Sequence, residues 1–163
     1  MNHPIWTNFF RRPEPQVAKI ARLWGDTLLF KGISQRALLQ LAKTMHPRRY
    51  AAGDTVFKQD DRGAGAALIL SGQVAVRSGN TTLAELSSGD FFGEVALAVD
   101  ERRTADAIAC EDTELVFFLR HELEEWIEQA PREGAQLGLN LALILGNRLR
   151  KANQMLARDH SES

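Results

Sequence analysis

Apolar residues recur at helical spacing near both ends of the chain and at strand spacing between them. A first helix is predicted after Pro13 and Pro15, which break any earlier helix, and Gly25 can end it. Its apolar face is formed by Val17, Ile20, Ala21 and Trp24. A second helix is predicted after Ser34, whose hydroxyl can cap the helix start. Its apolar face is formed by Leu38, Leu41, Ala42 and Met45.

Between residues 48 and 118 the pattern changes to short apolar runs separated by glycines. Seven of the twelve glycines lie between Gly53 and Gly93, and tight turns are indicated at residues 72–73 and 79–80. Short strands at this turn spacing favour a small sandwich or barrel. The predicted strands cover residues 55–57, 67–70, 74–76, 82–86, 104–110 and 113–119.

The last third of the chain is predicted to be helical. A helix over residues 121–129, ended by Pro131, has its apolar face formed by Leu123, Trp126 and Ile127. A long helix over residues 132–158 follows and carries two apolar stripes. The first stripe contains Leu137, Leu141 and Ile144, and the second contains Gly138, Ala142, Leu145, Leu149, Ala152 and Leu156. One stripe can cover the strand region, and the second, with heptad spacing and small residues, can meet the same helix of a second copy. The simpler alternative is one helix buried on its own domain.

Composition places the chain among ordinary globular proteins and excludes some functions. A length of 163 residues suits one domain with appendages, and 44% hydrophobic with 25% charged residues is typical of soluble proteins. The net charge of −1 gives no basic field for nucleic acid, and few residues follow the long helix to build a DNA-reading module. We therefore expect no nucleic-acid partner.

The sequence offers little for metal, redox or catalytic chemistry. Cys110 is the only cysteine and is predicted to lie in a core strand as a buried, inert thiol. The four histidines have no metal-ligand spacing, and no nucleophile motif is present, so neither a metal site, a cofactor nor an enzyme is predicted. Without a membrane-length apolar run or a secretory leader, we expect a cytoplasmic protein.

One segment carries the parts needed to hold a cyclic phosphate, namely residues 89–97 followed by 103–105. Gly93 allows the backbone to approach a ligand closely, and residues 95–99 can form a short helix whose first N–H groups face an anion. Glu94 can accept a hydrogen bond from a sugar hydroxyl. Arg103 offers a planar, charged fork to a phosphate.

This segment resembles the phosphate-binding cassette of the cyclic nucleotide-binding domain family. The family pattern Phe-Gly-Glu, an aliphatic residue and Ala-Leu matches residues 92–97 without a gap, and Arg103 has the expected offset from Glu94. Arg102 stands where many members have proline, so either arginine could face the phosphate. The resemblance covers about residues 27–130. It implies an α+β, mainly β fold: a jelly-roll-like β-roll with flanking helices and a long C-terminal helix.

The resemblance also implies roles for individual residues. Gly93 and Ala96 would donate backbone N–H groups to the phosphate, Glu94 would bind the ribose 2′-hydroxyl, and Arg103 would clamp the phosphate. The full implied ligand-binding set is Gly93, Glu94, Val95, Ala96, Arg103, Thr104 and Ala105. The base is expected against Val76 and Leu83, under a lid from the C-terminal helix. The implied ligand is cAMP or cGMP, and the choice stays open.

We therefore expect three parts: a helical arm (1–26), a nucleotide-binding β-roll (27–130) and a lid and dimerisation helix (131–159). The predicted function is a stand-alone cyclic nucleotide sensor that moves its last helix, forms a homodimer and acts on an unidentified downstream protein. One alternative is a degenerate domain that binds no nucleotide and serves as a dimerising scaffold. A less favoured alternative is a membrane-associated regulator that uses the aromatic arm, which otherwise packs on the domain. The aromatic arm contains Ile5, Trp6, Phe9 and Phe10.

Overall fold

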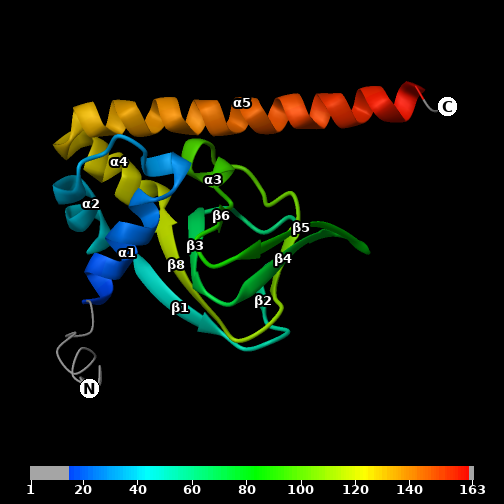
Figure 1. The fold of residues 1–163 in the computed structure, drawn as a ribbon, viewed down its shortest axis with the longest axis horizontal. Helices are drawn as coiled ribbons and strands as arrows, with labels where there is room; N and C mark the ends of the chain where they lie inside the picture. Colours follow the sequence, from blue (N-terminus) through cyan, green and yellow to red (C-terminus); the bar gives the residue numbers. More distant parts are fainter. Residues whose placement is uncertain (1–14, 162–163) are drawn as a thin grey trace, which may run out of the picture.

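Two antiparallel sheets stack into a roll, helices cover one of them, and a single long helix runs across the top and beyond the roll (Figure 1). The computed structural model describes residues 15–161. The helices are α1 (Gln16–Gly25), a 3₁₀ helix (Leu28–Phe30), α2 (Gln35–Ala42), α3 (Val95–Ala98), α4 (Arg120–Gln129) and α5 (Pro131–Ser161). The strands are β1 (His46–Tyr50), β2 (Thr55–Phe57), β3 (Gly65–Ser71), β4 (Gln73–Ser78), β5 (Thr81–Ser87), β6 (Phe91–Phe92), β7 (Asp106–Ala109) and β8 (Thr113–Leu119). The α+β, mainly β roll is confirmed.

The two sheets have different surroundings, which explains the sequence pattern of their strands. One sheet has the order β1-β8-β3-β6 and the other β2-β7-β4-β5. In β3, Leu68 and Leu70 pack against the helices while Ala67 and Ile69 pack against the second sheet. Because both of its faces are covered, β3 is a continuous apolar run. In β5, which forms an edge of the second sheet, most residues are exposed.

Two strands and one helix boundary differ from the sequence predictions. The predictions missed β1, whose sequence His-Pro-Arg-Arg-Tyr has no apolar alternation, and the two-residue strand β6. Proline is tolerated in β1 because this strand is a sheet edge. Pro131 stands at the first position of α5, where its missing N–H costs no hydrogen bond, so it begins that helix as well as following α4.

Cys110 is exposed, which contradicts the prediction of a buried thiol. The preceding strand β7 alternates, with Ala107 and Ala109 fully buried and Ile108 only partly buried. Side chains of a strand alternate between its faces, so the residue after Ala109 falls on the outer side, just beyond the end of β7. The strand predicted over residues 104–110 therefore runs one residue past the end of β7 at Ala109.

Helix α1 is part of the main core. Trp24 is fully buried, and its ring lies 5.1 Å from that of Phe30 and 6.4 Å from that of Phe118. Helix α2 packs beside α1, and Ser34 caps α2 as predicted by accepting a hydrogen bond from the Ala37 N–H at 3.3 Å. The aromatic residues of the arm before α1 lie outside the described residues. The three-part division of the chain stays a prediction.

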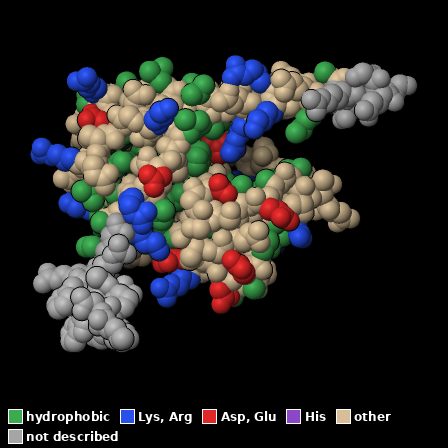
Figure 2. Space-filling view, in the orientation of Figure 1, with side chains coloured by type: hydrophobic (Ala, Val, Ile, Leu, Met, Phe, Trp, Pro, Cys, Tyr) green, Lys and Arg blue, Asp and Glu red, His purple; other side chains and the backbone are tan. Residues whose placement is uncertain are grey.

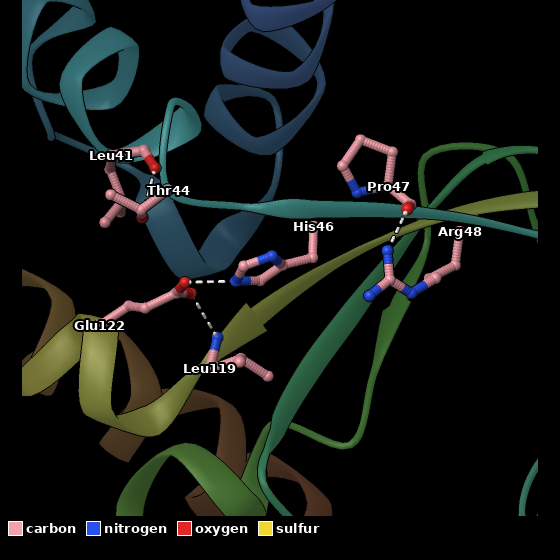
Figure 3. Close-up of polar contacts among 7 residues, drawn as sticks. All are labelled: Leu41, Thr44, His46, Pro47, Arg48, Leu119 and Glu122. Atoms are coloured by element: carbon pink, nitrogen blue, oxygen red, sulfur yellow. Dashed lines mark hydrogen bonds and ion pairs between the residues drawn. The ribbon is translucent and has the colours of Figure 1, made fainter.

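A small polar cluster fixes the start of α4 to the edge strand β1 (Figure 3). The Glu122 carboxylate lies 2.5 Å from His46 Nε2 and accepts a hydrogen bond from the Leu119 N–H at 3.0 Å. Glu122 thereby satisfies one of the open N–H groups at the helix start and holds α4 against the sheet. Within residues 15–161, no helix has the length and apolar content needed to cross a bilayer, and no group of three or more His, Cys, Asp or Glu side chains is placed to bind a metal ion.

Replacing Trp24 should test whether α1 belongs to the folding core. Trp24→Ala removes a fully buried indole, so we expect the free energy of unfolding to fall by about 3–5 kcal/mol in urea denaturation. Leu28→Ala is the control, because Leu28 is 39% exposed, and its loss should stay below about 1 kcal/mol. Equal, small losses for both variants would show that α1 is not part of the cooperative core.

Candidate functional site

A cavity of about 470 Å³ lies between the second sheet, the α3 segment and helix α5. All residues that the sequence analysis expected around a ligand line it: Val76, Leu83, Gly93, Glu94, Val95, Ala96, Arg103, Thr104 and Ala105. Arg102, the alternative arginine for the phosphate, lines it too. The remaining lining residues were not assigned from the sequence: Phe57, Ala84, Leu86, Phe92, Glu101, Arg148 and Lys151. The cavity therefore joins an apolar wall from β4, β5 and β6 to a charged end.

The backbone at Gly93 has a conformation that favours glycine. Its φ angle is +74°, and a Cβ atom at this position would lie 2.5 Å from Arg103 Nη1. Four-residue helix α3 begins two residues later, with the Ala96 N–H donating to the Gly93 carbonyl at 3.2 Å. The Ala96 N–H, predicted to meet a phosphate, would have to share this hydrogen bond with the ligand.

Glu94 is a fully buried carboxylate. Its Oε1 atom forms an ion pair with Nη1 of Arg148 from α5, but the two groups are not aligned as a hydrogen bond. Within the described part of the chain, neither oxygen of Glu94 accepts a hydrogen bond. A buried carboxylate without hydrogen-bond donors is costly, so this position is built to receive a donor.

Arg103 reaches into the same end of the cavity. Its guanidinium donates to the carbonyls of Gly93 at 3.2 Å and Gly65 at 2.8 Å, and lies 4.1 Å from the ring centroid of Phe57. Burial lowers the pKa of Arg103, while the negative charges of Glu94 and then Asp61 act in the opposite direction. The Nε atom is buried and has no hydrogen-bond partner among residues 15–161. The guanidinium therefore hydrogen-bonds to neutral carbonyls only and retains donor capacity for an anion.

The structure distinguishes the two neighbouring arginines. Arg102 is exposed, and its Nη1 donates to the Asp60 carbonyl at 2.7 Å. Arg103 is half-buried, and its backbone is held by the Asp61 carbonyl and the Asp60 N–H, each at 2.8 Å. Both side chains line the cavity. Arg103 differs from Arg102 because its guanidinium donates to the Gly93 carbonyl and because the charge of Glu94 acts to raise its pKa against the lowering by burial.

Arg148 and Lys151 could have been found from helix periodicity. The buried stripe of α5 ends at Ile144, and Arg148 and Lys151 follow it four and seven residues later on the same face. A stripe that changes from apolar to basic predicts that the helix passes from a packed core onto a polar site. In Figure 2, basic side chains gather along the part of α5 that overhangs the roll.

A family model described as the cyclic nucleotide-binding domain matches residues 47–130, just over half of the chain. The chain belongs to the cyclic nucleotide-binding domain family. Among its relatives, the cyclic AMP receptor protein of Thermus thermophilus is 33% identical over 130 residues, which cover 77% of this chain and 58% of the relative. A cGMP-dependent protein kinase of Toxoplasma gondii is 35% identical over 81 residues, 50% of this chain and 8% of the kinase.

Solved structures of this family share the fold. The catabolite activator protein of Thermus thermophilus superposes with a TM-score of 0.72 at 33% identity, covering 80% of this chain and 62% of that chain. A cyclic nucleotide-binding domain from Methylobacillus flagellatus gives a TM-score of 0.74 over 88% of this chain and 83% of that one, and at 22% identity it supports the fold alone. The chain spans about 58% of the length of the curated bacterial relatives it matches.

Gly93→Ala should lower the free energy of unfolding more than Gly53→Ala, although both glycines have a positive φ angle. Gly53 has a φ angle of +88° but open space around its Cβ position, so Gly53→Ala should lower the free energy of unfolding by about 1–2 kcal/mol. Gly93→Ala adds displacement of the Arg103 guanidinium and loss of its two hydrogen bonds, roughly 1–3 kcal/mol more. Urea denaturation measures both variants, and equal losses would show that Arg103 is not held against Gly93.

Proposed function

We propose that this protein is a cyclic nucleotide sensor that binds cAMP or cGMP in the 470 Å³ cavity and signals through helix α5. The observation that carries the proposal is the pair formed by Glu94 and Arg103. A fully buried carboxylate without hydrogen-bond donors lies beside a guanidinium that hydrogen-bonds only to neutral carbonyls. A ribose hydroxyl would supply the hydrogen-bond donor that the Glu94 carboxylate lacks. A cyclic phosphate would supply the anion that the Arg103 guanidinium lacks.

The remaining lining residues fit the other parts of such a ligand. Thr104 adjoins Arg103 and adds a hydroxyl and a backbone N–H toward the phosphate. Val76 and Leu83 form part of the apolar wall against which a base would lie. The proposed role is binding, not catalysis, and it requires no metal ion or cofactor. Both nucleotides share the phosphate and ribose, so this half of the site does not select between cAMP and cGMP.

A contact path leads from the cavity to the helices. Leu97 of α3 and Leu123 of α4 belong to the same buried core cluster. Arg120, the first residue of α4, donates to the Ala96 carbonyl at 3.2 Å and the Val99 carbonyl at 2.8 Å, and pairs with Asp100 at 3.2 Å. Hydrogen bonds from Arg62 and then Arg120 lower the pKa of Asp100. We infer that a shift of α3 on ligand binding passes to α4 and from there to α5, which packs on it.

A second candidate function is a degenerate domain that binds no nucleotide and serves as a dimerising scaffold. The Glu94–Arg148 ion pair favours it, because a cation from the protein itself compensates the buried carboxylate. The use of the aromatic arm at a membrane stays a separate prediction, since that segment lies outside the described residues.

We also propose that the protein forms a homodimer through the second stripe of α5. The stripe is largely uncovered in one copy: Leu149 is 63% exposed and Leu156 57% exposed, and Gly138 and Ala142 are exposed as well. Exposed leucines at heptad spacing beside small residues suit a close helix–helix contact.

Calorimetric titration with cAMP and cGMP tests the proposed function. We expect a dissociation constant in the micromolar range or below, about −8 kcal/mol. Arg103→Ala should weaken binding by roughly 2–5 kcal/mol because the desolvated phosphate loses its charged partner. The exposed Arg102 is the matched control, and Arg102→Ala should cost less than about 1 kcal/mol. Absence of binding at millimolar nucleotide would favour the scaffold, and reversed effects of the two arginines would assign the phosphate to Arg102.

The dimer is tested by light scattering at increasing protein concentration. Leu149→Glu places like charges across the proposed helix seam and should give monomers under conditions where the unmodified protein is a dimer. Leu139→Glu is the control, because Leu139 is 68% exposed and lies outside the second stripe. A monomeric unmodified protein at high concentration, or equal effects of the two variants, would refute this interface.

A further inference from the structure

Charge is unevenly distributed along the chain, although the net charge of the whole chain is only −1. Residues 1–45 contain seven Lys or Arg and two Asp or Glu, which gives them a net charge of +5. The remaining 118 residues contain thirteen Lys or Arg and nineteen Asp or Glu, a net charge of −6. Such an asymmetry indicates an anionic partner that binds at one end of the molecule, a membrane or a nucleic acid.

The fold places the described cations of this segment around helices α1 and α2. Arg36 and Lys43 are seven residues apart, about two helical turns, so both lie on the exposed face of α2, opposite its buried residues. Lys31 is exposed just before α2, and Lys19 lies on α1, which packs beside α2. In Figure 2, basic side chains lie along the left edge of the molecule, where Figure 1 shows α2.

These cations have no carboxylate partners in the described part of the chain. Lys19, Lys31, Arg36 and Lys43 form no ion pair within residues 15–161. The amine of Lys43 donates to the neutral side chain of Gln40 at 3.5 Å. The positive charge of this surface is therefore not neutralised by neighbouring acidic groups, and it is available to an external anion.

The basic end is a rigid part of the domain and is separate from the ligand cavity. Asn140 of α5 is buried, and its amide donates to the carbonyls of Leu29 at 2.9 Å and Lys31 at 2.8 Å. The α5 residues that line the cavity begin with Arg148, about 12 Å further along the helix than Asn140. A flat anionic surface can therefore meet α1 and α2 without entering the cavity.

The sequence that precedes α1 adds a second, apolar signal. The aromatic arm is followed directly by Arg11 and Arg12, so apolar and basic residues adjoin each other. Stable attachment of a peripheral protein to a membrane requires two signals, such as an apolar group together with a basic patch. Tryptophan is also enriched at the interface between membrane and water. Nucleic acid or an acidic protein would account for the cations but not for the aromatic arm, so these features together favour a lipid surface.

We propose that the α1–α2 end binds membranes that contain anionic lipids, with its exposed cations on the lipid headgroups and the aromatic arm in the membrane interface. This inference goes beyond the proposed function and does not depend on nucleotide binding. The attachment is peripheral, because no helix within residues 15–161 can cross a bilayer. Each cation close to an anionic leaflet raises the affinity about fivefold.

The test is co-sedimentation of the full chain with vesicles of phosphatidylcholine alone and with vesicles of phosphatidylcholine and phosphatidylglycerol in roughly equal amounts. We expect binding to the mixed vesicles only. It should fall when salt is raised from about 0.1 M to about 1 M, which shortens the screening length from about 10 Å to about 3 Å. Arg36→Gln combined with Lys43→Gln should weaken this binding roughly 10- to 30-fold.

The matched control removes one lysine and one arginine from the opposite part of the molecule. Lys58 and Arg77 are exposed and lie beside or in the second sheet. Lys58→Gln combined with Arg77→Gln should change binding to the mixed vesicles less than about twofold. All four positions are exposed, so neither pair should alter urea denaturation.

Tryptophan fluorescence tests the aromatic arm separately. The chain has three tryptophans, and Trp24 and Trp126 are only 0% and 7% exposed. A blue shift of the emission on addition of mixed vesicles should therefore report Trp6. Trp6→Phe should lose this shift and still sediment with the vesicles, whereas Trp6→Ser combined with Phe9→Ser should weaken binding roughly tenfold.

Each other result contradicts the inference. Equal binding to both vesicle types, or equal losses for the two glutamine pairs, would show that the cations of α2 do not recognise lipid headgroups. No sedimentation with either vesicle at low salt would rule out a membrane partner. Duplex DNA is titrated at the same salt concentration, and an affinity equal to or above that for the mixed vesicles would replace the lipid surface by nucleic acid.

Discussion

The burial of the Glu94 carboxylate is the constraint on which the arrangement of the cavity depends. A fully buried negative charge is tolerated only where cations or hydrogen-bond donors compensate it. Here the compensation comes from Arg148, with Arg103 contributing through its charge at longer range. The position of α5 above the roll, the turn at Gly93 and the placement of Arg103 beside it are therefore linked through one side chain. Only Glu94 is buried in this pair, because Arg148 is 54% exposed, so removing the Arg148 guanidinium would leave the buried carboxylate without its paired cation.

The roll provides the rigid support that such a site needs. The sheet formed by β1, β8, β3 and β6 is packed on both faces, against the helices on one side and the second sheet on the other. Short strand β6 pairs with β3 at Ala67 and Leu68 and leads directly into Gly93 and α3. The cassette thus begins at a sheet edge that is fixed by packing, and its far end is fixed by Arg120 at the start of α4. Along α5, by contrast, residues 145–157 include no buried residue.

Features set by neighbouring residues in the sequence were predictable, and features set by distant contacts were not. The apolar run of β3, the Ser34 cap and the cassette glycine follow from local patterns, so the roll and one end of the cavity were foreseen. Strand β1 was missed because its polar sequence becomes a strand only by pairing with β8. The prediction that Cys110 is buried was wrong because β7 ends at Ala109, one residue earlier. Where a strand ends depends on where its pairing with neighbouring strands stops, and a local sequence pattern does not show this. The Arg148 contact joins two segments that no local pattern connects.

The proposed ligand response and the proposed dimer contact involve two faces of the same helix, α5. Adjacent residues on an α-helix are about 100° apart, so Arg148 and Leu149 point in different directions from the same turn. Arg148 faces Glu94, whereas Leu149 is 63% exposed and belongs to the stripe proposed to meet a second copy. A helix turns as a rigid body over so short a segment. Any rotation or shift that strengthens the contact of Arg148 with Glu94 therefore moves Leu149 as well. On the proposed function, a ligand in the cavity and a second copy bound at the stripe must then influence each other's affinity.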